Sequence, residues 1–289
     1  MATRLAVLVI GATGQQGGAA ARHIVAGGHR VRALVRTPTS PKARTLASMG
    51  IELVPGDLDD RGSIERAVSG MDAVFVMTTP FQAGVDAETR QAIAAVDAAH
   101  AAGAFVVYTS VANADRHTGI PHFESKFAVE EHIHARGVPA TVLAPVYFME
   151  NLWFGLPHLR QGLYGSALRG ARSIMQVAVD DIGAAAVSVL DDRTRHTGQR
   201  YDLAGDELSP LEEAAILSDV TGRSIQYVQV PMDAIRQTMG EDGVRMYEFF
   251  EHPGYSIDRA ALGRAFPGIS WLSFRQWAER QDWASLLAG

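Results

Sequence analysis

The sequence predicts an α/β protein with a doubly wound parallel sheet and a smaller α+β lobe. Three observations support this prediction. Short apolar segments alternate with helical segments of ten or more residues in the first half of the chain, which is typical of a parallel sheet with helices on both faces. The first apolar segment has no polar alternation, which indicates a strand buried on both faces. That segment leads directly into a cluster of glycines.

The glycine cluster is the most informative stretch of the chain. A predicted strand at residues 5–10 is followed by Gly11, Gly14 and Gly17, and then by a predicted helix at residues 16–26. Glycine lets the backbone turn sharply and lets a pyrophosphate approach the amides at the start of a helix. Spacing alone would also suit an ordinary turn. The order strand, glycine turn and helix nevertheless favours a dinucleotide site.

The context of the glycines strengthens that interpretation. The helix ends at Gly27 and Gly28, a C-terminal glycine signal, and residues 29–36 form a second predicted strand. The result is a strand–helix–strand unit of roughly thirty residues, which is the setting a dinucleotide motif requires.

The elements that follow keep the same alternation. We expect strands at residues 51–54, 73–77, 105–108 and 141–143, and helices ending at residue 49 and spanning 63–68, 87–102 and 122–136. The whole pattern predicts a Rossmann-type sheet.

From residue 145 onwards the alternation ends. An aromatic cluster at 147–154 and a glycine-rich segment at 155–170 come first. Segments at 174–179, 181–190 and 201–203 are predicted to return to the main sheet, and 210–219, 225–230, 232–239 and 274–287 to build the smaller lobe. We therefore expect a dinucleotide-binding domain at 1–150 with returns near 174–204, and a substrate or partner lobe at 151–173 and 205–289.

Composition excludes several classes of protein. The chain has 289 residues, 47% of them hydrophobic and 20% charged, which is ordinary globular composition. It has no cysteine, so disulfides, thiolate catalysis and cysteine-bound metals are excluded. A net charge of -6 opposes direct binding of nucleic acid. The histidines show no metal-binding spacing, and we expect no metal site.

The same reading predicts a cytoplasmic protein. No apolar run approaches the ~20 residues that a bilayer demands, so no membrane association is expected. The first predicted strand begins at Leu5, which leaves no room for a signal peptide.

Residues at the strand ends predict the identity of the dinucleotide. An acidic residue after the second strand would accept the ribose 2′-hydroxyl of NAD, but this chain has Arg36 there. A guanidinium pairs well with a 2′-phosphate, and Lys42 would add a second charge, so we expect NADPH in preference to NAD. Asp57 and Leu58 would flank the adenine. The alternative is that Arg36 is only a solvated strand-end residue.

With these residues in view, the chain resembles the NmrA-like family, an atypical branch of the short-chain dehydrogenase/reductases. The matching stretches are residues 11–18, 56–60, 122–126, 138–143 and 147–151. The resemblance implies an NADP(H)-binding Rossmann domain with a variable C-terminal lobe. Members of the family are either regulators that respond to nicotinamide redox state or reductases of quinones, dyes or phenolic compounds.

The resemblance also implies where catalysis would occur. The superfamily uses a serine after the fifth strand and a tyrosine four residues before a lysine on the next helix. Ser110 and Lys126 match, but His122 replaces the tyrosine. His122 could donate a proton after hydride transfer, or could merely begin the helix. Tyr147 is a second candidate donor.

The complete predicted site has a cofactor part and a substrate part. The residues expected to bind the cofactor are Gly11, Thr13, Gly14, Gln15, Gln16, Gly17, Arg36, Lys42, Asp57, Leu58, Thr78, Thr79, Pro80, Lys126, Pro145, Tyr147, Phe148 and Asn151. Phe148, Trp153 and Phe154 are expected to line an apolar pocket for a flat aromatic substrate, although such a cluster could equally be core packing between the lobes.

Two functions follow from these expectations. The first is a reductase that passes hydride from NADPH to a quinone, a dye or another flat aromatic or carbonyl substrate. The alternative is a non-catalytic NADP(H) redox sensor in which the loop between Arg36 and Lys42 changes shape and alters contact with a regulatory protein partner. A homodimer is compatible with either function. A sugar epimerase is disfavoured, because that chemistry depends on the missing tyrosine.

Overall fold

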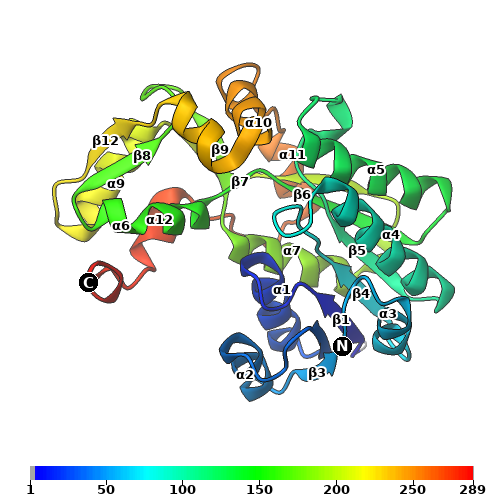
Figure 1. Cartoon of the computed structure of the whole chain (residues 1–289). Helices are drawn as coiled ribbons and strands as arrows, with labels where there is room; N and C mark the ends of the chain where they lie inside the picture. The colour runs from blue at the N-terminus through cyan, green and yellow to red at the C-terminus, as the bar shows by residue number, and fades with distance from the viewer. Residues whose placement is uncertain (1–3, 289) are drawn as a thin grey trace.

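The computed structural model describes residues 4–288 (Figure 1). Its main feature is a seven-stranded sheet in the order β10-β6-β5-β4-β1-β2-β3, with every pair parallel. The strands are β1 (Ala6–Ile10), β2 (Arg30–Val35), β3 (Glu52–Pro55), β4 (Ala73–Val76), β5 (Phe105–Thr109), β6 (Ala140–Pro145) and β10 (Arg200–Leu203). The strand order reverses between β1 and β4, which confirms the doubly wound prediction.

Helices cover both faces of this sheet. Successive side chains of β1 point to opposite faces, so Val7 and Val9 join one core while Leu8 and Ile10 join the other. The first core is closed by α1 (Gln15–Ala26), α2 (Pro41–Ser48) and α7 (Val179–Asp191), and the second by α3 (Arg61–Val68), α4 (Val85–Ala101) and α5 (Pro121–Ala135). Because each face of the sheet packs against its own core, successive residues of a strand such as β1 are all buried, and the strand is a continuous apolar run.

A smaller lobe lies at the upper left of Figure 1, beyond the carboxyl ends of β1 and β6. It contains a three-stranded sheet of β7 (Tyr147–Phe148), β9 (Ile174–Val177) and β11 (Asp206–Leu208), and a two-stranded sheet of β8 (Leu163–Ser166) and β12 (Gln226–Gln229). Its helices are η2 (Met149–Gly155), α6 (Leu156–Leu159), α9 (Pro210–Thr221), α10 (Met232–Glu251), α12 (Phe274–Glu279) and α13 (Trp283–Leu287). The short helices η1 (Ala114–Arg116), α8 (Arg193–His196) and α11 (Arg259–Ala265) complete the chain.

One predicted return to the main sheet is wrong. The segment 174–179 was expected there, but β9 pairs with β7 in parallel and with β11 in antiparallel orientation. The place beside β6 is taken by β10 instead. The other two returns occur, because α7 packs on α1 and β10 joins the sheet.

Two helices of the smaller lobe also differ from expectation. The helix expected at 232–239 continues as α10 to Glu251 across a break at Gly240, where φ is 70°. The single helix expected at 274–287 is two helices, because Asp282 caps the second by accepting a hydrogen bond from the amide of Ser285. No helix within the described residues 4–288 is long and apolar enough to span a bilayer.

The glycine turn is packed against the helix that follows it. A Cβ atom added at Gly17 would lie 2.3 Å from the carbonyl oxygen of Gly11, and one added at Gly11, where φ is 79°, would lie 2.6 Å from Cε of Met77. The first turn of α1 therefore touches the backbone at the end of β1, which only glycine permits.

We predict that Gly17→Ala lowers the free energy of unfolding by about 1–3 kcal/mol, because a backbone carbonyl cannot move aside for the added methyl group. Gly263→Ala is the matched control. Gly263 lies inside α11 with no atom within 4 Å of an added Cβ, so alanine there should be neutral or stabilising by about 0.5–1 kcal/mol. Urea denaturation measures both changes. Equal effects of the two substitutions would contradict the packing described here.

Candidate functional site

The predicted cofactor site lies where the glycine turn meets the start of α1. Gly14 is the N-cap residue of α1 and, within residues 4–288, no side chain caps this end of the helix. Its first amide groups are therefore available to an anion such as a pyrophosphate. The side-chain nitrogen Nε2 of Gln16 is buried and has no hydrogen-bond partner among the described residues. Both features suit a polar ligand along the turn.

The expected nicotinamide end of the site is organised around Lys126. Its Nζ donates to the carbonyl oxygen of Thr78 at 2.7 Å and lies 2.8 Å from Oε1 of Glu88. The hydroxyl Oγ1 of Thr78 is buried and, in the described part of the chain, has no partner. Such an orphaned buried hydroxyl calls for an external polar group, and the ribose of a dinucleotide would supply one.

His122 lies one turn before Lys126 on α5, as the four-residue spacing predicts. Its Nδ1 lies 2.5 Å from Oδ1 of Asp242 on α10, just after the break at Gly240. The ring of Phe81, in the loop after β4, has its centroid 6.4 Å from that of His122 and is 79% exposed. The structure thus brings an imidazole, its carboxylate partner and an exposed aromatic ring together.

Ser110 has a different environment from the one expected. Its buried hydroxyl donates to Glu130, which also pairs with Arg200 at 2.7 Å. Burial raises the pKa of the Glu130 carboxyl, while Arg200 opposes this effect. The structure therefore places Ser110 in a buried ionic network, and within residues 4–288 its hydroxyl has no hydrogen bond to His122 or Lys126.

Tyr147 forms part of a polar cluster in the smaller lobe. Burial raises the pKa of Tyr147 well above the usual value, and the neighbouring side chains of Tyr247 and Asn151 also influence it. Its ring packs edge-on against Phe250 with a centroid distance of 5.9 Å. Tyr147 and Asn151 follow the buried end of β6 at Pro145.

The predicted aromatic pocket is divided among three environments. Phe148 is half-buried against the core of the main sheet. Trp153 faces the C-terminal helices, with ring centroids 5.3 Å from Trp277 and 5.8 Å from Trp283. Phe154 is 81% exposed. The turn of η2 after β7 directs Trp153 into the core of the smaller lobe, so we withdraw it as a pocket residue.

The expected adenosine end has a cavity of about 310 Å³ beyond β2 and β3. Arg36 and Asp57 line it, and so do Asp60 and Arg66. Lys42 is exposed on α2 and is not among its lining residues. Leu58 packs on the core under α3 and α4.

The remaining predicted cofactor residues lie close to the crevice. Thr13 is half-buried in the glycine turn, and Thr79 and Pro80 are half-buried in the loop that follows β4.

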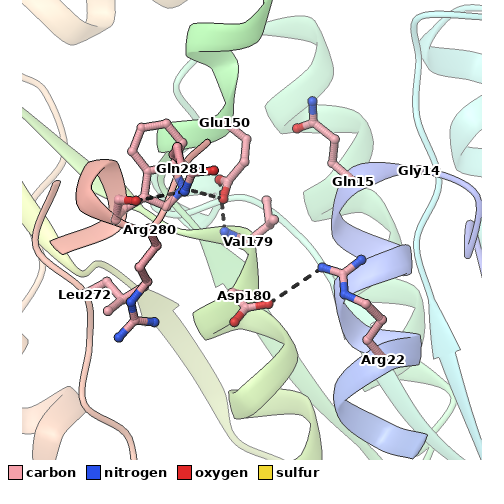
Figure 2. A pocket seen from close by; sticks show the side chains of 10 residues that line it. Gly14, Gln15, Arg22, Glu150, Val179, Asp180, Leu272, Arg280 and Gln281 are labelled. Atoms are coloured by element: carbon pink, nitrogen blue, oxygen red, sulfur yellow. Dashed lines mark hydrogen bonds and ion pairs between the residues drawn. The ribbon is translucent and has the colours of Figure 1, made fainter. Parts of the chain in front are cut away.

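A second cavity, of about 360 Å³, lies beside the glycine turn (Figure 2). Figure 2 shows the Arg22–Asp180 pair, with an N–O distance of 3.6 Å, on one side of it. On the other side the buried Glu150 accepts hydrogen bonds from the amide of Val179 at 3.0 Å and from Nε1 of Trp277 at 2.9 Å. Glu150 thereby ties α7 to the C-terminal helices, and its role is structural.

Sequence reasoning missed three residues of the site: Glu88, Asp242 and Phe81. The signal for Glu88 was present, because it shares the buried face of α4 with Ala92, Ala95 and Ala99, and a carboxylate on such a face needs a partner. Nothing in the sequence connects Asp242 to His122, since they are 120 residues apart. Among the described residues no group of His, Asp and Glu side chains is arranged to hold a metal.

The reversal of strand order, the uncapped glycine turn and the lysine on α5 together define a dinucleotide-binding Rossmann protein. The chain belongs to the NmrA-like family, whose model matches residues 3–265.

Relatives of known activity are similar over most of the chain. A (4-alkanoyl-5-oxo-2,5-dihydrofuran-3-yl)methyl phosphate reductase of Streptomyces griseus is 29% identical, covering 96% of each chain. An NAD(P)H azoreductase of Xenophilus azovorans is 31% identical, covering 81% of this chain and 80% of its own. The structure of the Citrobacter sp. triphenylmethane reductase complexed with NADP(H) is 25% identical, with a TM-score of 0.78 over 96% of this chain and 99% of that one.

Glu213 on α9 is a buried carboxyl group of the smaller lobe whose titration can be tested. It accepts hydrogen bonds from Tyr164 and Gln176, and burial raises its pKa to about 8. Glu213 therefore keeps its proton in the folded protein at pH values where the unfolded chain, with a pKa of 4.5, has released it. The contribution of this proton to the free energy of unfolding is complete below pH 4.5 and is lost as pH rises through about 8.

We therefore predict that the free energy of unfolding falls by about 2–3 kcal/mol between pH 6 and pH 8 in the unmodified protein. Glu213→Gln should remove most of this fall, because the amide does not titrate. Its oxygen can still accept from Gln176, and its NH2 group can donate to the hydroxyl of Tyr164. Chemical denaturation at several pH values measures the difference. The pH range starts at 6 because the carboxyl of Asp181 has a pKa of about 6. Most of the change in stability caused by Asp181 therefore falls below this range. Parallel pH curves for the two proteins would refute the prediction.

Proposed function

We propose that this protein is an NADPH-dependent reductase that transfers hydride to a flat conjugated acceptor such as a quinone or a dye. The observation that carries the proposal lies at the carboxyl end of β4. There Nζ of Lys126 donates to the carbonyl oxygen of Thr78, and the hydroxyl of the same threonine is buried without a partner among residues 4–288. Both polar groups lie where the ribose next to the reacting ring would sit in a doubly wound sheet.

The relatives support the class of reaction. An azoreductase, a triphenylmethane reductase and a (4-alkanoyl-5-oxo-2,5-dihydrofuran-3-yl)methyl phosphate reductase are all named for reduction. Their identities to this chain lie between 25% and 31%.

Bound NADPH supplies the hydride, and the chain supplies orientation and protons. The free amides at the start of α1 bind the pyrophosphate, and Lys126 donates a hydrogen bond to the ribose. Asp242 engages Nδ1 of His122, which leaves Nε2 as the ring nitrogen that faces a substrate and donates a proton. The exposed ring of Phe81 offers a stacking surface beside that imidazole.

The test is a turnover screen with NADPH, several quinones and several azo dyes. We expect oxidation of NADPH above the protein-free rate with at least one acceptor. His122→Gln should slow azo reduction by about 10²-fold, because a general acid contributes on that order. It should affect quinone reduction much less, because aromatisation drives that step. Binding of NADP(H) without turnover of any acceptor would favour the redox-sensor alternative.

We further propose that Arg36 sets a preference for NADPH over NAD. Arg36 is exposed and lines the adenosine cavity, and a charge-assisted contact to the 2′-phosphate is worth about 1.5–3 kcal/mol. Arg36→Ala should therefore raise KM for NADPH by about 10–100-fold and leave KM for NADH nearly unchanged. Arg30→Ala, an exposed arginine at the opposite end of β2, is the control and should change neither value. Loss of affinity for both cofactors in Arg36→Ala would refute this assignment.

A further inference from the structure

Glu88 is a buried carboxylate at the edge of the proposed nicotinamide site. It lies in the first turn of α4, and its side chain has no exposed surface. Ser125 donates a hydrogen bond to Oε2 at 2.7 Å, and Nζ of Lys126 lies 2.8 Å from Oε1. Both partners come from α5, so the carboxylate is enclosed between two helices of the same face of the sheet.

Such a buried charge needs an explanation beyond stability. A buried ion pair is often no more stabilising than apolar side chains of similar volume. The neighbours of Glu88 on its face of α4 are alanines at positions 92, 95 and 99, so an apolar residue would suit the helix. The carboxylate is therefore better explained by its effect on Lys126.

Glu88 and the carbonyl group of Thr78 together hold the ammonium group of Lys126. The ammonium group has three N–H bonds. One donates to the carbonyl oxygen of Thr78 at 2.7 Å. Oε1 of Glu88 lies 2.8 Å from Nζ as an ion-pair contact and accepts no hydrogen bond among the described residues. The lysine side chain keeps 12% of its surface exposed, and the orphaned hydroxyl of Thr78 belongs to the same residue that holds the ammonium. The ammonium therefore keeps N–H groups for a ligand in the crevice.

We propose that Glu88 is a positioning residue that holds Lys126 and cancels its charge, so that the site tolerates the positively charged oxidised nicotinamide as well as the neutral reduced one. This inference rests on the proposed function, because it requires NADP(H) beside Lys126. Without the carboxylate, an unpaired ammonium would lie next to the ring that becomes positive on oxidation. Two like charges in a partly buried site repel each other strongly.

Measured affinities for the two cofactor forms test the proposal. Glu88→Gln should raise the ratio of Kd for NADP⁺ to Kd for NADPH by about tenfold or more, because only the oxidised ring carries charge. Lys126→Met should shift the same ratio in the opposite direction, because the carboxylate is then left unpaired. Ser125→Ala is the matched control. It removes a neutral hydrogen bond to Glu88 and should leave the ratio unchanged. Calorimetry and NADPH fluorescence give both constants without turnover.

The outcomes separate this inference from the proposed function. Opposite shifts in Glu88→Gln and Lys126→Met support the positioning role, and either variant alone gives an informative sign if the other fails to fold. Equal changes in the affinities for NADP⁺ and NADPH, or no change in either, would overturn the positioning role of Glu88. The proposed reductase function would still hold in that case if the unmodified protein binds the cofactor. Failure of the unmodified protein to bind either form would overturn the proposed function itself.

Discussion

The contact between Gly17 and the carbonyl group of Gly11 is the constraint on which the rest of the site depends. It brings the first turn of α1 against the end of β1, with no room for a side chain between them. Because β1 is one of the two neighbouring strands between which the sheet order reverses, this contact fixes where a crevice opens between the two halves of the sheet. The amides of α1 then face that crevice uncapped.

The second organising element is α5, which presents its functional groups on one face. His122, Lys126 and Glu130 follow at four-residue spacing, and each contacts an ionisable side chain from another element: Asp242 of α10, Glu88 of α4 and Arg200 of β10. These pairs tie the helix to the smaller lobe, to its neighbouring helix and to the edge of the sheet. In two of these pairs a carboxylate holds a group of the proposed site, the imidazole of His122 or the ammonium of Lys126.

Much of the fold follows from the sequence, because parallel strands and their helices are local patterns. The seven strands of the main sheet, the glycine turn and the i, i+4 relation of His122 to Lys126 required no long-range information. The smaller lobe was harder. The segment that forms β9 pairs with the two-residue strand β7 and with β11, which comes later in the chain. The partner of a short strand is set by tertiary packing rather than by its own residues. Likewise Trp153 has the composition of a pocket residue, and only the later helices show that it belongs to a core. Asp242 depends on the break in α10 at Gly240, which the sequence alone does not connect to α5.

The most direct test of this account is a crystal structure of the protein with NADPH bound. We expect the pyrophosphate on the amides of α1 and the nicotinamide ribose within hydrogen-bonding distance of Nζ of Lys126, with the contact between Lys126 and Glu88 retained. A cofactor bound away from the glycine turn, or a nicotinamide ribose with no contact to Lys126, would contradict it.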